Sequence, residues 1–166
     1  MRLAGLETLM KRSTPVAANS PATQLDTFIR RFDPALRKLV RDARARLRRR
    51  LPTAIELVYD NYSALAIGFA SSERKSDTIV ALAVYARGVN LYFMYGAALA
   101  DPHHLLLGSG NQGRFVRLES AAMLDRREID ELLAAAIAEG ETPLPRSGRG
   151  HIVIKSVSPK RRLRRP

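Results

Sequence analysis

The sequence predicts an α+β domain with two layers, in which an antiparallel sheet of about five strands packs against N-terminal helices and a C-terminal helix. Three observations lead to this prediction. Apolar residues recur with helical spacing over 34–50 and 125–139, and they alternate with other residues over 55–69. The turns between the apolar runs from 55 to 95 are short, which indicates antiparallel neighbours because parallel strands need a long crossover.

Two helices are expected at the start of the domain, and each begins at a proline that follows a capping residue. Ser20-Pro21 and Asp33-Pro34 both place an N-cap side chain before proline at the first helical position. The second helix ends before Pro52, because proline disfavours helical geometry in the residue that precedes it. One side of this helix is apolar, and the opposite side carries four arginines with helical spacing. These arginines are Arg37, Arg41, Arg44 and Arg48.

The first strand, 55–60, has the alternation that is typical of a half-buried strand. In this strand Ile55, Leu57 and Tyr59 alternate with Glu56, Val58 and Asp60, so the two groups of side chains are expected on opposite sides. Further strands are expected over 65–69, 78–86, 89–95 and 115–118. Ile152-Val153-Ile154 has two interpretations, an added edge strand or a docked tail.

The last helix is expected to begin at a capping box. Asp125 serves as the N-cap, Glu128 reaches back from the third helical position, and Leu124 packs against Ile129. Gly140 ends this helix. The residues expected in the core are Leu39, Leu47, Ile67, Leu82, Phe93, Ile129 and Leu133.

The length of 166 residues suits one domain. We divide the chain into a flexible extension (1–20), the α+β domain (21–141) and a basic tail (142–166). The chain has no cysteine, which excludes disulfides and thiolate metal sites and favours a reducing, cytoplasmic location. It has no apolar run long enough to cross a membrane, so we expect no membrane partner.

The net charge of +12 is concentrated in two segments. Residues 29–51 hold ten Lys or Arg against two Asp, and residues 146–166 hold eight Lys or Arg with no acid. One interpretation is a solvated helix face with a solubilising tail. The other is a surface for non-specific nucleic acid or another polyanion, since no base-reading motif accompanies the charge. That surface comprises the four helix arginines together with Lys160, Arg161 and Arg162.

A glycine-rich loop before the fifth strand suggests a small anionic ligand. Gly108 and Gly110 allow backbone amides to converge, and Arg114 offers a bidentate fork. The loop is not a P-loop, because no Gly-Lys-Ser/Thr follows it. The alternative is a simple connection whose glycines form turns.

The same ligand is expected to contact Tyr59, Asn61 and Tyr62 at the end of the sheet, with Glu56, Asp60 and Glu119 as further lining acids. The alternative for the tyrosines is ordinary packing, with the ring inside and the hydroxyl at the rim. No pair of acids has a spacing that identifies a general acid and base, so the sequence favours binding over catalysis and indicates no cofactor.

The histidines do not indicate a metal site. His103 and His104 are adjacent on a helical turn, so they point apart, and Asp101 is expected to cap that turn. His151 lies alone in the basic tail, where neighbouring positive charge disfavours metal binding.

From about Leu25 to Ile137 the chain resembles the YdhG-like family, a family of unknown function. The similar segments are a basic N-terminal helix, 56–59, 89–93, Gly96, 99–102, 105–110, Arg114 and the closing helix. The resemblance implies a helix–sheet–helix fold related in shape to frataxin, and an iron chaperone as one alternative function. This chain departs from the family in its cationic N-terminal helix, where frataxin-type iron binding uses an acidic ridge.

Overall fold

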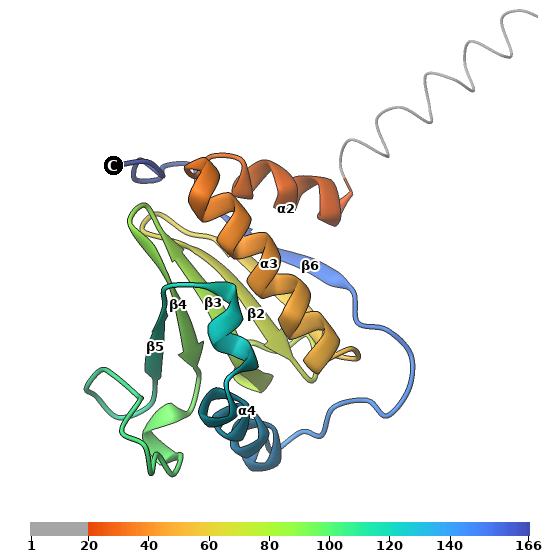
Figure 1. Cartoon of the computed structure of the whole chain (residues 1–166). Helices are drawn as coiled ribbons and strands as arrows, with labels where there is room; N and C mark the ends of the chain where they lie inside the picture. The colour runs from red at the N-terminus through yellow and green to blue at the C-terminus, as the bar shows by residue number, and fades with distance from the viewer. Residues whose placement is uncertain (1–19) are drawn as a thin grey trace, which may run out of the picture.

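The computed structural model describes residues 20–166 and has the predicted α+β architecture (Figure 1). Helices α2 (Pro21–Ile29), α3 (Pro34–Arg50) and α4 (Arg127–Glu139) pack on one face of a six-stranded sheet. The extension expected over 1–20 lies outside the described residues except for Ser20. No helix in the described part of the chain is long and apolar enough to span a membrane.

Five strands form the expected antiparallel meander. They are β1 (Ile55–Asp60), β2 (Leu65–Ala70), β3 (Thr78–Tyr85), β4 (Gly88–Phe93) and β5 (Arg114–Leu118). Three short 3₁₀ turns connect the elements: Lys75–Asp77 (η1) lies between β2 and β3, Gly96–Ala98 (η2) between β4 and β5, and Ala121–Asp125 (η3) between β5 and α4.

A sixth strand, β6 (Ile152–Val157), extends the sheet by pairing in parallel with β1, so the strand order is β5-β4-β3-β2-β1-β6. This confirms the edge-strand interpretation of 152–154 and carries the sheet past the boundary expected at residue 141. Gly150 makes the approach possible, because a Cβ atom there would lie 1.6 Å from the carbonyl oxygen of Ala54. No other residue type fits that position without moving the backbone.

The predicted helix starts are correct for α2 and α3 but wrong for α4. The side-chain cap expected from Asp33 does not form, and the Asp33 carboxylate lies 3.8 Å from Arg165 Nε instead. Ser20 caps α2, since its Oγ accepts a hydrogen bond from the Thr23 amide at 3.2 Å. The capping box at Asp125 does not form, because Ala121–Asp125 is a 3₁₀ turn and α4 begins only at Arg127. The Asp125 carboxylate instead accepts from Arg46 Nε of α3 at 3.1 Å, so an ion pair replaces the expected cap.

The core lies between the helices and the sheet. Six of the seven residues expected there are buried, and Leu39 is half-buried against the same cluster. On β2 the core side is formed by Leu65, Ile67 and Phe69, which pair laterally with Asp60, Val58 and Glu56 of β1.

The half-buried pattern expected for β1 is therefore wrong. Glu56 and Asp60 lie on the side of the sheet that faces the helices, and they are only 3% and 1% exposed. Leu57, on the opposite side, is also buried. A period-2 pattern assigns charged residues to solvent, but here arginines from other segments neutralise both acids inside the protein.

Candidate ligand cavity

The residues expected to form an anion pocket lie at opposite ends and opposite sides of the sheet. Tyr59, Asn61 and Tyr62 lie at the end of β1. At this end of the sheet, Asp60 is in register with Leu118, the last residue of β5, across the three strands between them. Arg114 begins β5, which three other strands separate from β1, and it pairs with Phe93 at the other end of the sheet. These side chains cannot contact one ligand.

The glycine-rich loop is a connection rather than an anion cradle. Gly108 and Gly110 have φ angles of 110° and 109°, which glycine adopts readily and other residues rarely do. Arg114 Nη1 donates to the carbonyl oxygens of Gly110 and Gly113, at 3.0 and 2.7 Å. The guanidinium therefore closes its own loop, and this favours the alternative interpretation.

Tyr59 is a packing residue. Its ring lies on the sheet face opposite the helices, beneath the Lys75 ammonium at 5.7 Å from the ring centroid. Its hydroxyl is buried without a hydrogen-bond partner in the described part of the chain. Burial raises the pKa of Tyr59.

The histidines lie at the surface. His103 approaches Glu131 at 3.4 Å and His151 approaches Glu73 at 3.1 Å, and both are exposed. The Asp101 carboxylate accepts from the amides of Leu105 and Leu106 at 2.9 Å each, as expected for a cap. The turn itself is not helical, however, because His104 has a φ of 54°. Within residues 20–166 no three His, Asp or Glu side chains come close enough to hold a metal ion.

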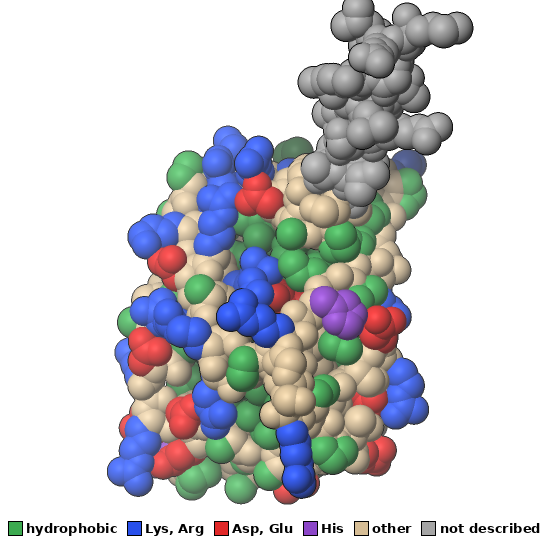
Figure 2. Space-filling model, turned by 90° about the vertical axis from the view of Figure 1, so that its right-hand side faces the viewer, with side chains coloured by type: hydrophobic (Ala, Val, Ile, Leu, Met, Phe, Trp, Pro, Cys, Tyr) green, Lys and Arg blue, Asp and Glu red, His purple; other side chains and the backbone are tan. Residues whose placement is uncertain are grey.

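The arginine side of α3 is mostly engaged by acids. Arg41 pairs with Asp26 at 2.8 Å, and Arg44 holds buried Glu56 through two hydrogen bonds of 2.6 and 3.1 Å. Arg48 lies 3.4 Å from the same carboxylate, and Arg37 Nε donates to the Phe32 carbonyl at 2.7 Å. Figure 2 shows basic and acidic side chains interspersed on this side of the molecule. The stripe expected to be open to solvent is so only in part: the Arg41 and Arg48 side chains are 47% and 51% exposed, whereas the Arg44 side chain is only 20% exposed.

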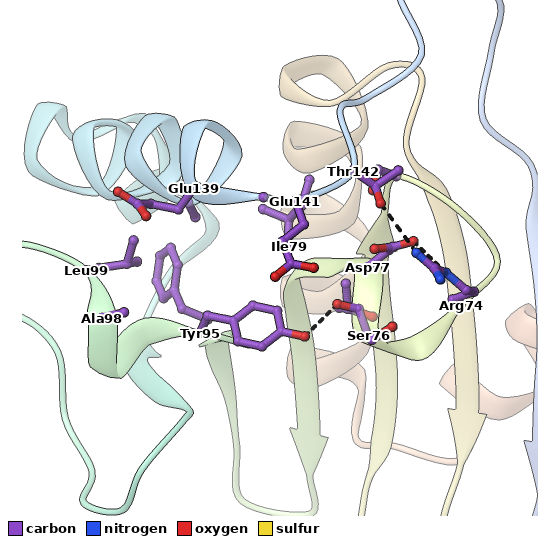
Figure 3. A pocket seen from close by; sticks show the side chains of 15 residues that line it. Arg74, Ser76, Asp77, Ile79, Tyr95, Ala98, Leu99, Glu139, Glu141 and Thr142 are labelled. Carbon is purple, nitrogen blue, oxygen red and sulfur yellow. Dashed lines mark hydrogen bonds and ion pairs between the residues drawn. The ribbon is translucent and has the colours of Figure 1, made fainter.

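The structure contains a cavity of about 300 Å³ at the end of the sheet where β4 finishes (Figure 3). Its walls come from the β2–β3 connection, the start of β3, the segment after β4, and the C-terminal end of α4. These segments lie far apart in the sequence and meet only because β3 and β4 are neighbours under α4.

The floor of this cavity is apolar and includes Ile79, Phe93, Leu99 and Ala136. Tyr95 lies at its rim, half-open to solvent, and its hydroxyl donates to the Ser76 carbonyl at 2.6 Å. That hydrogen bond holds the ring across the mouth of the cavity, as Figure 3 shows. The floor and the ring together fit a ligand with an apolar body.

Asp77 provides a fixed negative charge on one wall. Its Oδ2 accepts from Ser72 Oγ at 2.5 Å and from Arg74 Nε at 3.1 Å. The Ser72 hydroxyl, and after it Arg74 and Thr142, hold the pKa of Asp77 below its ordinary value of 3.8. The carboxylate is therefore ionised at neutral pH.

The opposite wall is the C-terminal end of α4, which carries Glu139 and, just beyond Gly140, Glu141. Neither carboxylate forms an ion pair with another described residue, and the last turn of α4 has no basic side chain. Acids at this end of a helix are unfavourable by roughly 0.3–1 kcal/mol each, because the macrodipole is negative there. The cavity thus has three carboxylates against the single guanidinium of Arg74, in a chain whose net charge is +12.

Comparison of the chain with models of protein families, with curated proteins and with solved structures gives no match. The resemblance to the YdhG-like family and the frataxin-like shape that it implies stay hypotheses drawn from the sequence.

Sequence reasoning did not identify this cavity. Residues 71–77 have the composition of an exposed loop, and Tyr95 ends a strand. One local signal was present: Glu139 and Glu141 flank the glycine that ends α4, where basic residues are usual. The apolar floor had no local signal, because its residues belong to four separate segments.

Proposed function

We propose that the protein is a non-enzymatic module that binds a small organic cation in the cavity between α4 and the β2–β3 connection. The observation that carries this proposal is the negative charge of the cavity on a strongly basic chain. The expectation of a small ligand is retained, but both its position and the sign of its charge differ from those predicted.

The chemistry of the lining favours an amine over other ligands. The carboxylates of Asp77, Glu139 and Glu141 can accept hydrogen bonds from an ammonium or guanidinium group. The Tyr95 ring adds a face that attracts cations. The apolar floor favours an organic body over a bare metal ion, which requires several oxygen ligands. A volume of about 300 Å³ is at the small end of ligand pockets.

Calorimetric titration with three compounds of one shape tests the proposal: phenethylamine, neutral 2-phenylethanol and anionic 3-phenylpropionate. Saturable binding of phenethylamine alone, at about 150 mM salt, is the expected result. The Glu139→Gln/Glu141→Gln variant should weaken it about tenfold or more. Glu119→Gln removes an exposed acid elsewhere and serves as the control. Equal affinity for the amine and the carboxylate, or no binding of either, would refute a cation site.

Non-specific association with nucleic acid is the second candidate. It is favoured by the net charge and by exposed Lys160, Arg162 and Arg48, although Arg162 also stacks on Tyr62 at 5.6 Å. Titration with duplex DNA at about 150 mM salt tests this candidate. If the charge is only solubilising, the dissociation constant should be weaker than about 10⁻⁴ M, the weak end of non-specific binding, whereas a sub-micromolar value would favour nucleic acid. Membership of the YdhG-like family and a cytoplasmic location belong to the same proposal, whereas an iron chaperone role rests on that resemblance alone.

A further inference from the structure

Buried Asp60 is surrounded by three arginines, here called together with it the Asp60 cluster (Asp60, Arg31, Arg161 and Arg164). The guanidinium nitrogens of Arg31 and Arg161 lie 2.9 and 3.0 Å from Oδ2, and that of Arg164 lies 2.9 Å from Oδ1. The side chains of Asp60 and Arg164 are 1% and 3% exposed. Arg31 and Arg161, at 34% and 26%, form the side of the cluster that reaches solvent.

Two of the three arginines come from residues 158–166, the C-terminal segment, which folds back from β6 beside the start of α3 (Figure 1). The Ser158 amide donates to the Asp60 carbonyl and the Arg162 amide to the Tyr62 carbonyl, both at 2.8 Å. Arg164 also donates to the Asn61 carbonyl at 2.6 Å. The last part of the basic tail predicted over 142–166 is therefore attached to the domain at several points.

The Asp60 cluster has more positive than negative charge. Guanidinium groups remain protonated in proteins, so three of them outweigh even a fully ionised Asp60 by two charges. The acids on α2 and just before α3 are occupied: Asp33 approaches Arg165 at 3.8 Å, and Asp26 binds Arg30 and Arg41.

The cluster also has donors without acceptors. Arg161 Nε and Arg164 Nη1 are buried and have no hydrogen-bond partner among residues 20–166. Buried donors are seldom left unpaired, and charged ones are the most costly to leave so. Asp60 already accepts hydrogen bonds from Arg31 and Arg164 and forms an ion pair with Arg161, whose Nη2 donates to the Ser158 carbonyl. The missing acceptor therefore has to come from outside the cluster.

We infer that the Asp60 cluster binds a phosphate-type oxyanion. Such an ion carries the one to two negative charges that the cluster lacks, and its tetrahedral oxygens accept from planar guanidinium forks. It would enter beside Arg31 and Arg161, with the C-terminal segment shifting to bring the unpaired donors to its oxygens. This site is at the Asp60 end of the sheet, whereas the cation cavity is at the Phe93 end, so the two are independent.

Inorganic phosphate titrated into the full-length protein at about 150 mM NaCl tests this inference. One saturable site with a dissociation constant of about 1 mM or tighter is expected. Arg161→Gln should weaken it tenfold or more, since Arg161 is partly exposed and its removal leaves Asp60 paired with two arginines. The matched control is Arg49→Gln, which removes the same charge from an exposed position on α3. Absence of a saturable site up to about 20 mM, or equal weakening by both variants, would overturn the inference.

A second variant tests the site in the opposite direction. Asp60→Asn removes the competing carboxylate, so phosphate should bind more tightly, and phosphate should raise the thermal midpoint of this variant more than that of the wild type. Circular dichroism identifies whether the variant is folded; an unfolded Asp60→Asn chain that phosphate does not refold would count against the site. Adenosine monophosphate serves as the comparison ligand. If it binds at least tenfold more tightly than phosphate and still requires Arg161, the oxyanion is part of a nucleotide; equal affinity assigns the site to free phosphate.

Discussion

Glu56 and Asp60 are four residues apart on β1 and face the same side of the sheet, yet they are neutralised in different ways. Glu56 is held by Arg44 and Arg48, both from α3 and at helical spacing. Asp60 is held by Arg31 from the turn between α2 and α3 and by two arginines from the C-terminal segment. The first acid depends on one neighbouring helix, whereas the second joins the beginning and the end of the described chain.

The comparison predicts that Asp60 contributes more to stability than Glu56. Asp60→Ala leaves Arg164 buried without its carboxylate, and we expect a loss of about 3–5 kcal/mol in the free energy of unfolding. Glu56→Ala should cost about 1–3 kcal/mol, because Arg44 and Arg48 are partly exposed and can turn toward water. Urea denaturation of both variants checks the order, and an equal or reversed order would break the comparison.

A double-mutant cycle measures the coupling free energy between Asp60 and the C-terminal segment. Deleting 158–166 from the wild type removes Arg161 and Arg164, and it should destabilise the protein far more than the same deletion does in an Asp60→Asn background. A coupling free energy of about 0.5–3 kcal/mol is expected for groups in direct contact. Additive effects would mean that the segment acts through its other contacts alone.

A solvent-exposed ion pair provides the reference for both buried acids. Arg50 of α3 lies 2.7 Å from Asp130 of α4, but both side chains are at least 40% exposed. Arg50→Gln should therefore change the free energy of unfolding by no more than about 1 kcal/mol. A larger effect would show that contact between α3 and α4, rather than burial of charge, dominates the stability of this domain.

The smallest expected effect is the pH dependence of the stability that Asp77 contributes. Because hydrogen bonds lower its pKa in the folded state, its contribution to stability is present above the ordinary value of 3.8 and is lost as the pH falls through the folded value. The difference in stability between the wild type and Asp77→Asn should shrink from pH 5 to pH 3. Ser72→Ala, which removes the main cause of the shift, should remove most of this pH dependence; an unchanged profile in that variant would assign the effect to another group.

Much of the fold could be predicted because its signals are local. Proline after a capping residue marked the starts of α2 and α3, helical periodicity identified the buried sides of α3 and α4, and short turns between apolar runs indicated the antiparallel meander from β1 to β4. The start of α4 was missed because the Asp125 side chain binds Arg46, a residue far away in the sequence.

The sequence by itself determined which segments are helices and strands and where most of the core lies, since periodicity and turn chemistry act over a few residues. Only the tertiary structure decided which side of β1 faces the helices, where β6 joins the sheet, and where a cavity forms. Each of these depends on residues far apart in the chain, such as Asp60 with Arg164, which form an ion pair, or Tyr95 and Glu139, which line the same cavity. A buried carboxylate is stable only when its counter-charge arrives from elsewhere, and no window of neighbouring residues contains that information.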